Sequence, residues 1–573
     1  MTATAWTVFK GNTPEPMEVE ILGVLRGARG PGHDMILAQL HGAKPEYTGV
    51  VAGMSGSPVY IGKRLLGSLS FRIGQFSKDP IAGITPIAQM LEVRDLPLDD
   101  GGLTLAGAQS LPGASGAPAS SDSGLGQPGS GMTFQAMETP LTMSGFGPGA
   151  IRLWQQKMAG TGLEMVAAGG VGGSSEPDPK PRGAGQAAAL APILPGSAVT
   201  AQLVRGDLEI AATCTVTYVD PKQLLACGHP ILQAGPVSLP MTRAEVVATL
   251  ASPLNAFKII NTGETIGAFT EDRDAAIRGV FGAEARMIPV HIEVHGSGPA
   301  RKLNVEVLDL PSLTPQALLV SIYEILSESN EAAADTSYHL TGSVDLAGHP
   351  ASPIDVWAPA SDQLPAPLSA SLLATEKFAK IYSNWGRRGA IRSIDLHIEA
   401  VPRRVQVELE TARLVSSDIA HAGDTIVVEA TLRPWQQPTR NVRIPITLPA
   451  RLGAGSLRLL VSDAATLDRT LDQPRMVTHA PDLDTVLAQA GQSHAADRIY
   501  VSLLVPETQA GMAGRTLTSL PLSMANALEP LRTAQDVNLN GESAEVAGEV
   551  SAGGVLTGFQ ILNLRIEPGG GLD

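Results

Sequence analysis

The chain has 573 residues, which predicts roughly three to five domains rather than one. Its formal charge of −15 comes without a long basic run, and no apolar stretch reaches about 18 residues, so neither a nucleic-acid partner nor a transmembrane segment is expected. Glycine (61 residues) and proline (43) are frequent and aromatic residues make up only 4%, which is typical of a β-rich chain with many turns.

Residues 1–95 predict a small β-domain. Short apolar or alternating runs, such as 17–25 (MEVEILGVL) and 65–71 (LLGSLSF), are separated by turns, and a short helix is expected near residues 86–93. A flexible linker rich in Gly, Ala, Ser and Pro is predicted next, followed by a small α/β insertion and a second linker. Their expected bounds are 96–135, 136–168 and 169–190.

Residues 191–300 predict a second β-domain. Within it, Thr242 and Glu245 have the spacing of a capping box, which predicts the start of a helix. Cys214 and Cys227 flank a turn at residues 220–222, and a hairpin centred there places them opposite each other, close enough for a disulfide. Two reduced core cysteines are the alternative, and the sequence does not decide between them.

The C-terminal half predicts at least three further regions. Residues 301–402 mix strands with two helices, one beginning at Thr314 and Pro315 and one over residues 368–382. Residues 403–465 alternate at a period of two, which favours an immunoglobulin-like β-sandwich. For residues 466–573 a helix around 483–489 and a strand at 499–505 are expected, but no fold is assigned.

The stretch Gly53-Met54-Ser55-Gly56-Ser57-Pro58 carries the clearest chemical signal. Flanking glycines let the backbone turn sharply, and they allow the amides of Gly53 and Ser55 to approach a substrate carbonyl as an oxyanion hole requires. The stretch resembles the nucleophile loop of chymotrypsin-like serine proteases, whose GDSGGP motif is likewise followed by a hairpin. A glycine-serine turn without catalytic function is the alternative.

A serine nucleophile needs a base, and His229 is the leading candidate among 11 histidines. It follows an apolar strand and lies between Gly228 and Pro230. His33 and His41 are closer to Ser55 in sequence but fit ordinary loops, and His291 and His295 alternate along a strand as on a solvent face. No spacing suits a metal or a phosphate loop, so no metal and no cofactor are expected.

Two blocks, GMSGSP with the downstream FSKDPIAGITPI and TVTYVDPKQLLACGHPI, are similar to the SpoIVB-type serine peptidase family of bacterial sporulation and envelope proteins. The resemblance implies Ser55 as nucleophile and His229 as general base, on a trypsin-like pair of β-barrels. The serine block precedes the histidine block here, whereas the order is reversed in the sporulation protein. A permuted pair of barrels can still build one site, because catalytic triads occur in several chain orders.

The third member of the triad is expected on the same barrel as His229 and some tens of residues after it, by resemblance to chymotrypsin-like barrels. Asp272 fits that position best. Its neighbours Asp274 and Glu271 compete for the role, Asp34 on the serine half is a further candidate, and a dyad without a carboxylate is the remaining alternative.

The sequence therefore predicts a serine endopeptidase that acts on protein or peptide substrates through an acyl-enzyme. The resemblance implies restricted specificity or self-processing, and a periplasmic or secreted location with envelope protein partners. The alternative is an inactive protease-like scaffold that binds envelope proteins or polymers through its C-terminal β-domains. An esterase is disfavoured, because the strand–GxSxG–helix elbow of α/β-hydrolases is absent from the sequence.

Overall fold

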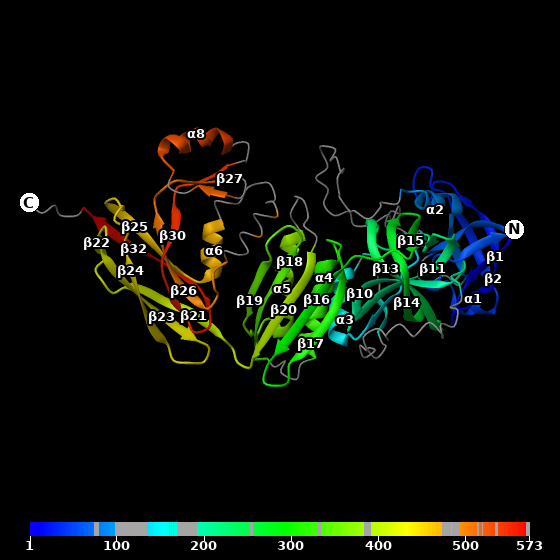
Figure 1. Cartoon of the computed structure of the whole chain (residues 1–573), viewed down its shortest axis with the longest axis horizontal. Coiled ribbons are helices and arrows are strands. Elements are labelled where there is room, and N and C mark those ends of the chain that lie inside the picture. The colour runs from blue at the N-terminus through cyan, green and yellow to red at the C-terminus, as the bar shows by residue number, and fades with distance from the viewer. Residues whose placement is uncertain are drawn as a thin grey trace, which may run out of the picture. The chain divides into compact units, whose positions relative to one another are not determined.

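The chain is mainly β, with 52% of its residues in strands and 17% in helices, and it contains a closed six-stranded barrel and curled half-barrel sheets. The computed structural model describes residues 1–73, 79–97, 134–159, 161, 163, 165–168, 192–252, 256–328, 334–382, 391–472, 483, 487, 493–512, 515–517, 520–532 and 537–568. The chain divides into two compact units, Met1–Ile288 with Asn304–Glu324, and Pro289–Leu303 with Ile325–Asp573. Figure 1 labels helices and strands of both units, coloured from the N-terminus to the C-terminus.

The first unit begins with six strands whose pairings form a ring in the order β1-β2-β3-β6-β5-β4, because β4 pairs with both β1 and β5. Alternating apolar residues of these strands fill one core. The antiparallel strand β7 (Phe134–Ala136) extends the ring from β5. The bounds of these strands and of the two helices among them are β1 (Thr2–Thr7), β2 (Glu15–Leu25), β3 (Met35–His41), α1 (Ala43–Thr48), β4 (Pro58–Ile61), β5 (Arg64–Ile73), β6 (Ile81–Pro86) and α2 (Ile87–Arg94). Helix α2 confirms the helix predicted near residues 86–93.

A second set of six strands in this unit also pairs in a ring, in the order β10-β13-β14-β15-β12-β11 with β10 paired to β11. Strands β8 and β9 extend it from β11. The bounds are β8 (Leu141–Ser144), α3 (Pro148–Met158), β9 (Met165–Ala168), β10 (Ala198–Gly206), β11 (Glu209–Val219), β12 (Gln223–Ala226), β13 (Gly235–Leu250), β14 (Phe257–Arg273) and β15 (Ala276–Phe281). Strand β17 (Arg301–Leu308) and helix α4 (Thr314–Ser327) follow later in the chain.

The predicted helix at Thr242 is wrong, because this residue lies within strand β13. Thr242 pairs with Thr200 on one side and with Thr265 on the other. A capping box stabilises a helix start by satisfying amides that lack partners, and here the neighbouring strands engage this part of the backbone. Tertiary pairing therefore overrides the local signal.

Cys214 and Cys227 form a disulfide, with their Cα atoms 5.0 Å apart. The turn between β11 and β12 lies where the sequence predicts it. The register does not follow the simple hairpin, because a bulge between Val216 and Tyr218 shifts the pairing.

In the second unit, four strands of the 13-stranded sheet pair in the order β19-β18-β20-β16, and β16 and β20 run parallel. Helix α5 packs against β18 and β19. The bounds are β16 (Met287–His295), β18 (Ser337–Leu346), β19 (Ser352–Ala358), α5 (Ala366–Tyr382) and β20 (Ile391–Val401). Helices α4 and α5 confirm the two helices predicted between residues 301 and 402.

The C-terminal part of the second unit has a four-stranded sheet, β24-β23-β21-β31, and a five-stranded sheet, β22-β32-β25-β26-β30. Apolar residues of both sheets form one core. The bounds are β21 (Gln406–Leu414), β22 (Ile419–His421), β23 (Thr425–Pro434), β24 (Arg440–Thr447), β25 (Gly455–Ser462), β26 (Arg498–Val505), β30 (Ser543–Ser551), β31 (Val555–Thr557) and β32 (Phe559–Glu567). The sequence predicts that the sandwich ends at residue 465, but strands β26, β30, β31 and β32, which follow that residue, belong to the same two sheets. Strand β26 confirms the strand predicted at 499–505.

A small sheet, β28-β27-β29, and helices α6 and α8 complete this unit. Their bounds are α6 (Ala464–Asp472), β27 (Gln509–Met512), β28 (Arg515–Leu517), α8 (Leu522–Arg532) and β29 (Val537–Asn540). Most of the predicted helix at 483–489, of which only residues 483 and 487 are described, and most of the predicted linkers at 96–135 and 169–190 lie outside the described residues. Among the helices that are described, none is both long and apolar enough to cross a bilayer.

Candidate active site

Ser55 lies in a tight loop between α1 and β4 of the first strand ring, and this loop hydrogen-bonds to β11 of the second ring. Gly53 (φ 93°) and Gly56 (φ 94°) flank it in the left-handed conformation that favours glycine. A Cβ atom on Gly56 would lie 1.8 Å from the carbonyl oxygen of Thr215, so only glycine fits there. Thr215 fixes the loop to β11, since its amide donates to the carbonyl of Ser55 (2.8 Å) and its hydroxyl to that of Gly53 (2.8 Å).

His229 follows a second strained turn, which packs against the first. Cys227 (φ 69°) and Gly228 (φ 73°) are both left-handed, which is unusual for a non-glycine residue such as Cys227. Cys227 is also bonded to Cys214. A Cβ atom on Gly56 would approach the amide nitrogen of Cys227 to 2.6 Å, so the two turns touch. The hydroxyl of Thr85 donates to the carbonyl of Gly228 (2.6 Å) and fixes this turn to β6.

Two reactive atoms in these turns lack partners. Ser55 is 0% exposed and His229 2% exposed, yet neither Ser55 Oγ nor His229 Nε2 has a hydrogen-bond partner among the described residues, and they do not bond to each other. His229 Nδ1 lies 2.8 Å from the carbonyl oxygen of Pro230. That carbonyl can only accept, so Nδ1 carries the proton and Nε2 is an acceptor. Burial lowers the pKa of His229 to about 4, which keeps the ring neutral at pH 7.

The amides predicted to form the oxyanion hole are also unengaged. No hydrogen bond found among the described residues has the amide of Gly53 or Ser55 as its donor. By contrast, the Gly56 amide donates to Leu69 (2.8 Å) and the Ser57 amide donates to Met54 (2.9 Å). The loop therefore keeps the two expected donors available for a ligand oxygen.

Asp272 lies near His229 in the chain fold but does not bond to its ring. Its carboxylate accepts the amides of Ile231 (2.8 Å) and Leu232 (2.6 Å), in the loop that follows His229. Burial raises the pKa of Asp272, and the amide hydrogen bonds oppose that shift. In this conformation the backbone of Pro230 orients the imidazole, and Asp272 positions the loop that carries it.

The other carboxylate candidates also have partners elsewhere. Asp274 pairs with Arg29 and lies 3.8 Å from His33, and its charge acts on His229 only through space. Glu271 pairs with Arg273 at 2.8 Å. Asp34 accepts the amide of Gly27 (2.8 Å), as in a turn. Among the described residues, none of these carboxylates bonds to the ring of His229.

Lys258 is a functional candidate that the sequence reasoning missed. It is 0% exposed, its backbone amide bonds to the carbonyl of Ala52 (3.2 Å), and its Nζ lies 2.7 Å from Thr7 Oγ1 and 3.4 Å from Thr215 Oγ1. Burial lowers the pKa of Lys258 to about 7, within the range of a general base. The available signal was a lysine inside the apolar run Phe257 to Ile260.

Residues 134–140 cover the Ser55 loop. Strand β7 pairs with β5, the amide of Met137 donates to the carbonyl of Ser70 (2.8 Å), and the carbonyl of Pro140 accepts the amide of Thr213 (3.0 Å). A Cβ atom on Gly53 would lie 3.1 Å from Cγ of Pro140. The segment thus extends from β5 to β11 across Gly53 and closes the site.

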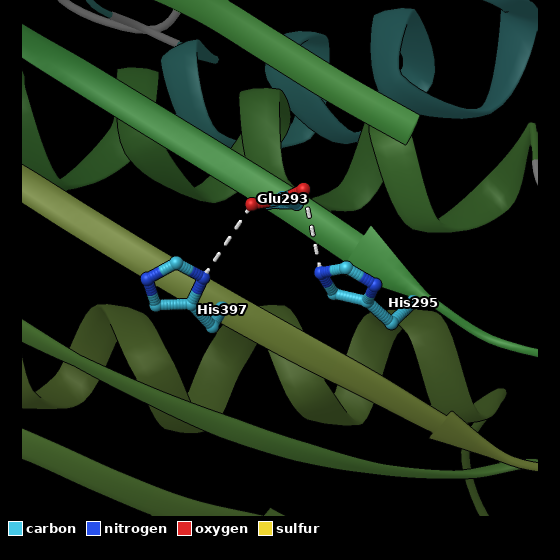
Figure 2. A group of neighbouring side chains, drawn as sticks. All are labelled: Glu293, His295 and His397. Carbon is cyan, nitrogen blue, oxygen red and sulfur yellow. Dashed lines mark ion pairs between the residues drawn. The ribbon is translucent and has the colours of Figure 1, made fainter. Parts of the chain in front are cut away.

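The second unit holds a different cluster, where the sequence predicts no metal ligands. Glu293, His295 and His397 come from two neighbouring strands, and their donor atoms lie within 4.8 Å of one another (Figure 2). Sequence spacing missed this group because strand pairing alone brings His397 beside Glu293.

Comparison with known proteins identifies no relative of this chain, so any function must be argued from the geometry of the site. No family model, no curated protein and no solved structure matches this chain.

Proposed function

We propose that the first unit is a serine endopeptidase of the SpoIVB type. The observation that carries the proposal is the pair of buried, unpartnered atoms, Ser55 Oγ and His229 Nε2, on two strained turns that touch. A buried polar atom without a hydrogen bond costs about 1 to 3 kcal/mol, so native proteins seldom leave one unsatisfied. Other buried side-chain atoms, such as Thr213 Oγ1 and Ser462 Oγ, also lack a partner among the described residues. Ser55 and His229 differ from them because they have complementary chemistry and belong to strained turns that touch, which supports a catalytic role.

In the proposed mechanism, His229 Nε2 takes the proton from Ser55 Oγ as the oxygen attacks a peptide carbonyl. The amides of Gly53 and Ser55 stabilise the resulting oxyanion, and His229 returns the proton to the leaving amine. Water then hydrolyses the acyl-enzyme by the same route. The neutral imidazole with a free Nε2 is the protonation state that the first step requires.

The two rings of strand pairings support the trypsin-like part of the proposal. Each ring has six strands, one supplies Ser55 and the other supplies His229, in the permuted order that the sequence indicates. We extend the proposal to an immunoglobulin-like C-terminal sandwich and to a periplasmic or secreted protein with protein substrates. The disulfide between Cys214 and Cys227 is typical of an oxidising compartment and supports that location.

The conformation described here is the closed form of the proposed enzyme. Residues 134–136 of the covering segment lie along β5 as an added strand, which is one way in which extended peptides bind to sheet edges. A substrate reaches Ser55 only after this segment leaves. The proposal therefore includes an opening step before acylation.

Lys258 offers a second base for the same reaction class. Its pKa of about 7 and its packing beside Gly53 favour a serine–lysine arrangement in the opened form. Asp272 is assigned a positioning role in either case, because it holds the loop after His229.

The test is labelling of the full chain with a fluorophosphonate probe, followed by intact mass. We expect a single adduct that is absent in Ser55→Ala and forms at least about 100-fold more slowly in His229→Ala. Ser57→Ala is the matched control, because the Ser57 hydroxyl is already engaged with the carbonyl of Met54 (2.6 Å). An adduct that persists in Ser55→Ala would overturn the proposal. Loss in Lys258→Met with retention in His229→Ala would transfer the role of base to Lys258.

The closed site is tested with Met137→Ala. Met137 is 2% exposed and anchors the covering segment in the barrel core, so its truncation removes about 2 to 5 kcal/mol of packing and favours opening. We expect labelling of Ser55 to accelerate about tenfold or more. If neither the wild type nor Met137→Ala reacts while both remain folded by circular dichroism, the inactive scaffold is the correct reading.

A further inference from the structure

The sheet of the second unit has one apolar and one polar face. In β16, residues Ile288, Val290, Ile292 and Val294 are buried, so the alternate residues point to the opposite face. Strand β20 alternates in the same way, with Ile394, Leu396 and Ile398 buried. The polar face therefore carries six histidine and acidic side chains from two adjacent strands: His291, Glu293, His295, Asp395, His397 and Glu399.

Parallel pairing brings three of these side chains together. Glu293 lies directly opposite His397, and His295 follows Glu293 on the same face. His295 Nε2 is 3.4 Å from Glu293 Oε1, and His397 Nδ1 is 3.8 Å from Glu293 Oε2. Figure 2 shows the two imidazoles on either side of the carboxylate. Each imidazole ring therefore directs one nitrogen toward the carboxylate of Glu293.

We propose that Glu293, His295 and His397 bind a divalent metal ion of the zinc type. Two imidazole nitrogens and one carboxylate oxygen form a donor set that Zn²⁺ commonly takes in proteins, with a fourth position left open. Tetrahedral ligands at about 2.0 to 2.2 Å lie roughly 3.4 Å from one another, and the three donor atoms here already lie within 4.8 Å. The histidine side chains are 54% and 62% exposed, so small rotations complete the geometry without repacking.

The open position faces a groove of about 560 Å³ lined by both ligand histidines, His339, Thr341 and Glu399. His339 is held there, because it bonds to Asp355 (2.9 Å) and stacks on Trp357 with ring centroids 4.0 Å apart. One wall of the groove is therefore fixed while the metal-binding side chains remain adjustable. A water or a small ligand on the metal has room in this groove.

Lys302 competes with the metal in the proposed site. Its Nζ lies 3.3 Å from Glu293 Oε1 and is 68% exposed. A bound cation would replace this ammonium group as the partner of the carboxylate. Removal of Lys302 should therefore strengthen metal binding, whereas loss of a ligand should weaken it.

The experiment is calorimetric titration of the full chain with ZnCl₂, together with Co²⁺ spectroscopy of the same samples. We expect one ion per chain and a Co²⁺ spectrum of a site with nitrogen and oxygen ligands. His295→Ala and His397→Ala should each weaken binding by tenfold or more, since even residues outside the ligand set change metal affinity by about 10- to 100-fold. Lys302→Ala should tighten it.

His421→Ala is the matched control. His421 is 47% exposed and lies 3.4 Å from Asp424, so it is a similar exposed histidine–carboxylate pair that belongs to no three-residue metal-binding group among the described residues. It should leave Zn²⁺ affinity unchanged. Equal affinity in the wild type and in both ligand variants, or no stoichiometric binding at all, would overturn the proposal. All readouts are independent of peptidase activity.

Discussion

The Ser55 site and the group Glu293, His295 and His397 on β16 and β20, called the histidine face below, are both polar clusters. They differ in the backbone conformation that positions their side chains. The first is buried, and left-handed residues on both turns fix its shape. The second lies on regular strands, and its ligand side chains project into solvent. A site that needs an unusual backbone conformation can be recognised in the sequence by its glycines, prolines and cysteine. A site that forms when distant strands pair cannot be recognised from the residues next to one another in the sequence.

The largest effect is expected for Gly56→Ala. The new Cβ atom would overlap the carbonyl of Thr215, so the loop must leave its place on β11. We expect a loss of more than about 4 kcal/mol of unfolding free energy, measured by urea denaturation. Gly62→Ala is the control, because Gly62 is also left-handed (φ 60°) but has open space around its Cβ position, and it should lose only about 1 to 2 kcal/mol. Equal losses in the two variants would show that packing on β11 does not define the site.

The second prediction concerns Lys258. Burial lowers its pKa in the folded chain to about 7 from an ordinary value of 10.5, so between these values the unfolded chain binds a proton that the folded chain does not. Lys258 therefore lowers the free energy of unfolding most below pH 7, and this penalty shrinks as pH increases toward 10.5. Lys258→Met should stabilise the protein by about 1 to 4 kcal/mol at pH 7, and this gain should shrink toward pH 9.5.

Urea denaturation at several pH values measures the effect of Lys258→Met, with the exposed Lys63→Met as control. The control should show no pH-dependent difference from the wild type. A constant gain for Lys258→Met from pH 7 to 9.5 would mean that Lys258 has an ordinary pKa in the folded chain.

The smallest effect is expected on the histidine face. His295→Ala and His397→Ala remove exposed side chains from regular strands, so in metal-free buffer each should change unfolding free energy by no more than about 0.5 kcal/mol. Added Zn²⁺ should then stabilise the wild type but neither variant. Thermal melts with and without ZnCl₂ make this measurement, and a large loss in the metal-free variants would indicate a structural role instead.

The sequence predicts correctly those backbone features that depend on neighbouring residues. The glycines around Ser55, the Gly-His-Pro sequence at His229 and the Thr-Pro start of α4 each mark a backbone feature that the structure contains. The capping-box pattern at Thr242 failed, because pairing with β10 and β14 outweighs a local helix signal.

Long-range features could not be predicted in the same way. The distance along the chain from His229 favours Asp272 as the third triad member, but the amides that its carboxylate accepts depend on the bend of the loop after His229. The burial of Lys258 and the meeting of His397 with Glu293 depend on which strands become neighbours. Composition and periodicity do not determine that choice.

The two units alternate along the chain, since residues 289–303 belong to the second unit and residues 304–324 return to the first. Strand β16 therefore precedes α4 in sequence, although its partner β20 follows it. A fragment that begins after Glu324 would expose one edge of β20, and a fragment that ends at Ile288 would lack α4. No single cut yields both units whole, because a cut after Ile288 removes Asn304–Glu324 from the first unit and a cut after Glu324 removes Pro289–Leu303 from the second. In genetic terms, a recombination breakpoint inside residues 289–324 would separate parts of both units.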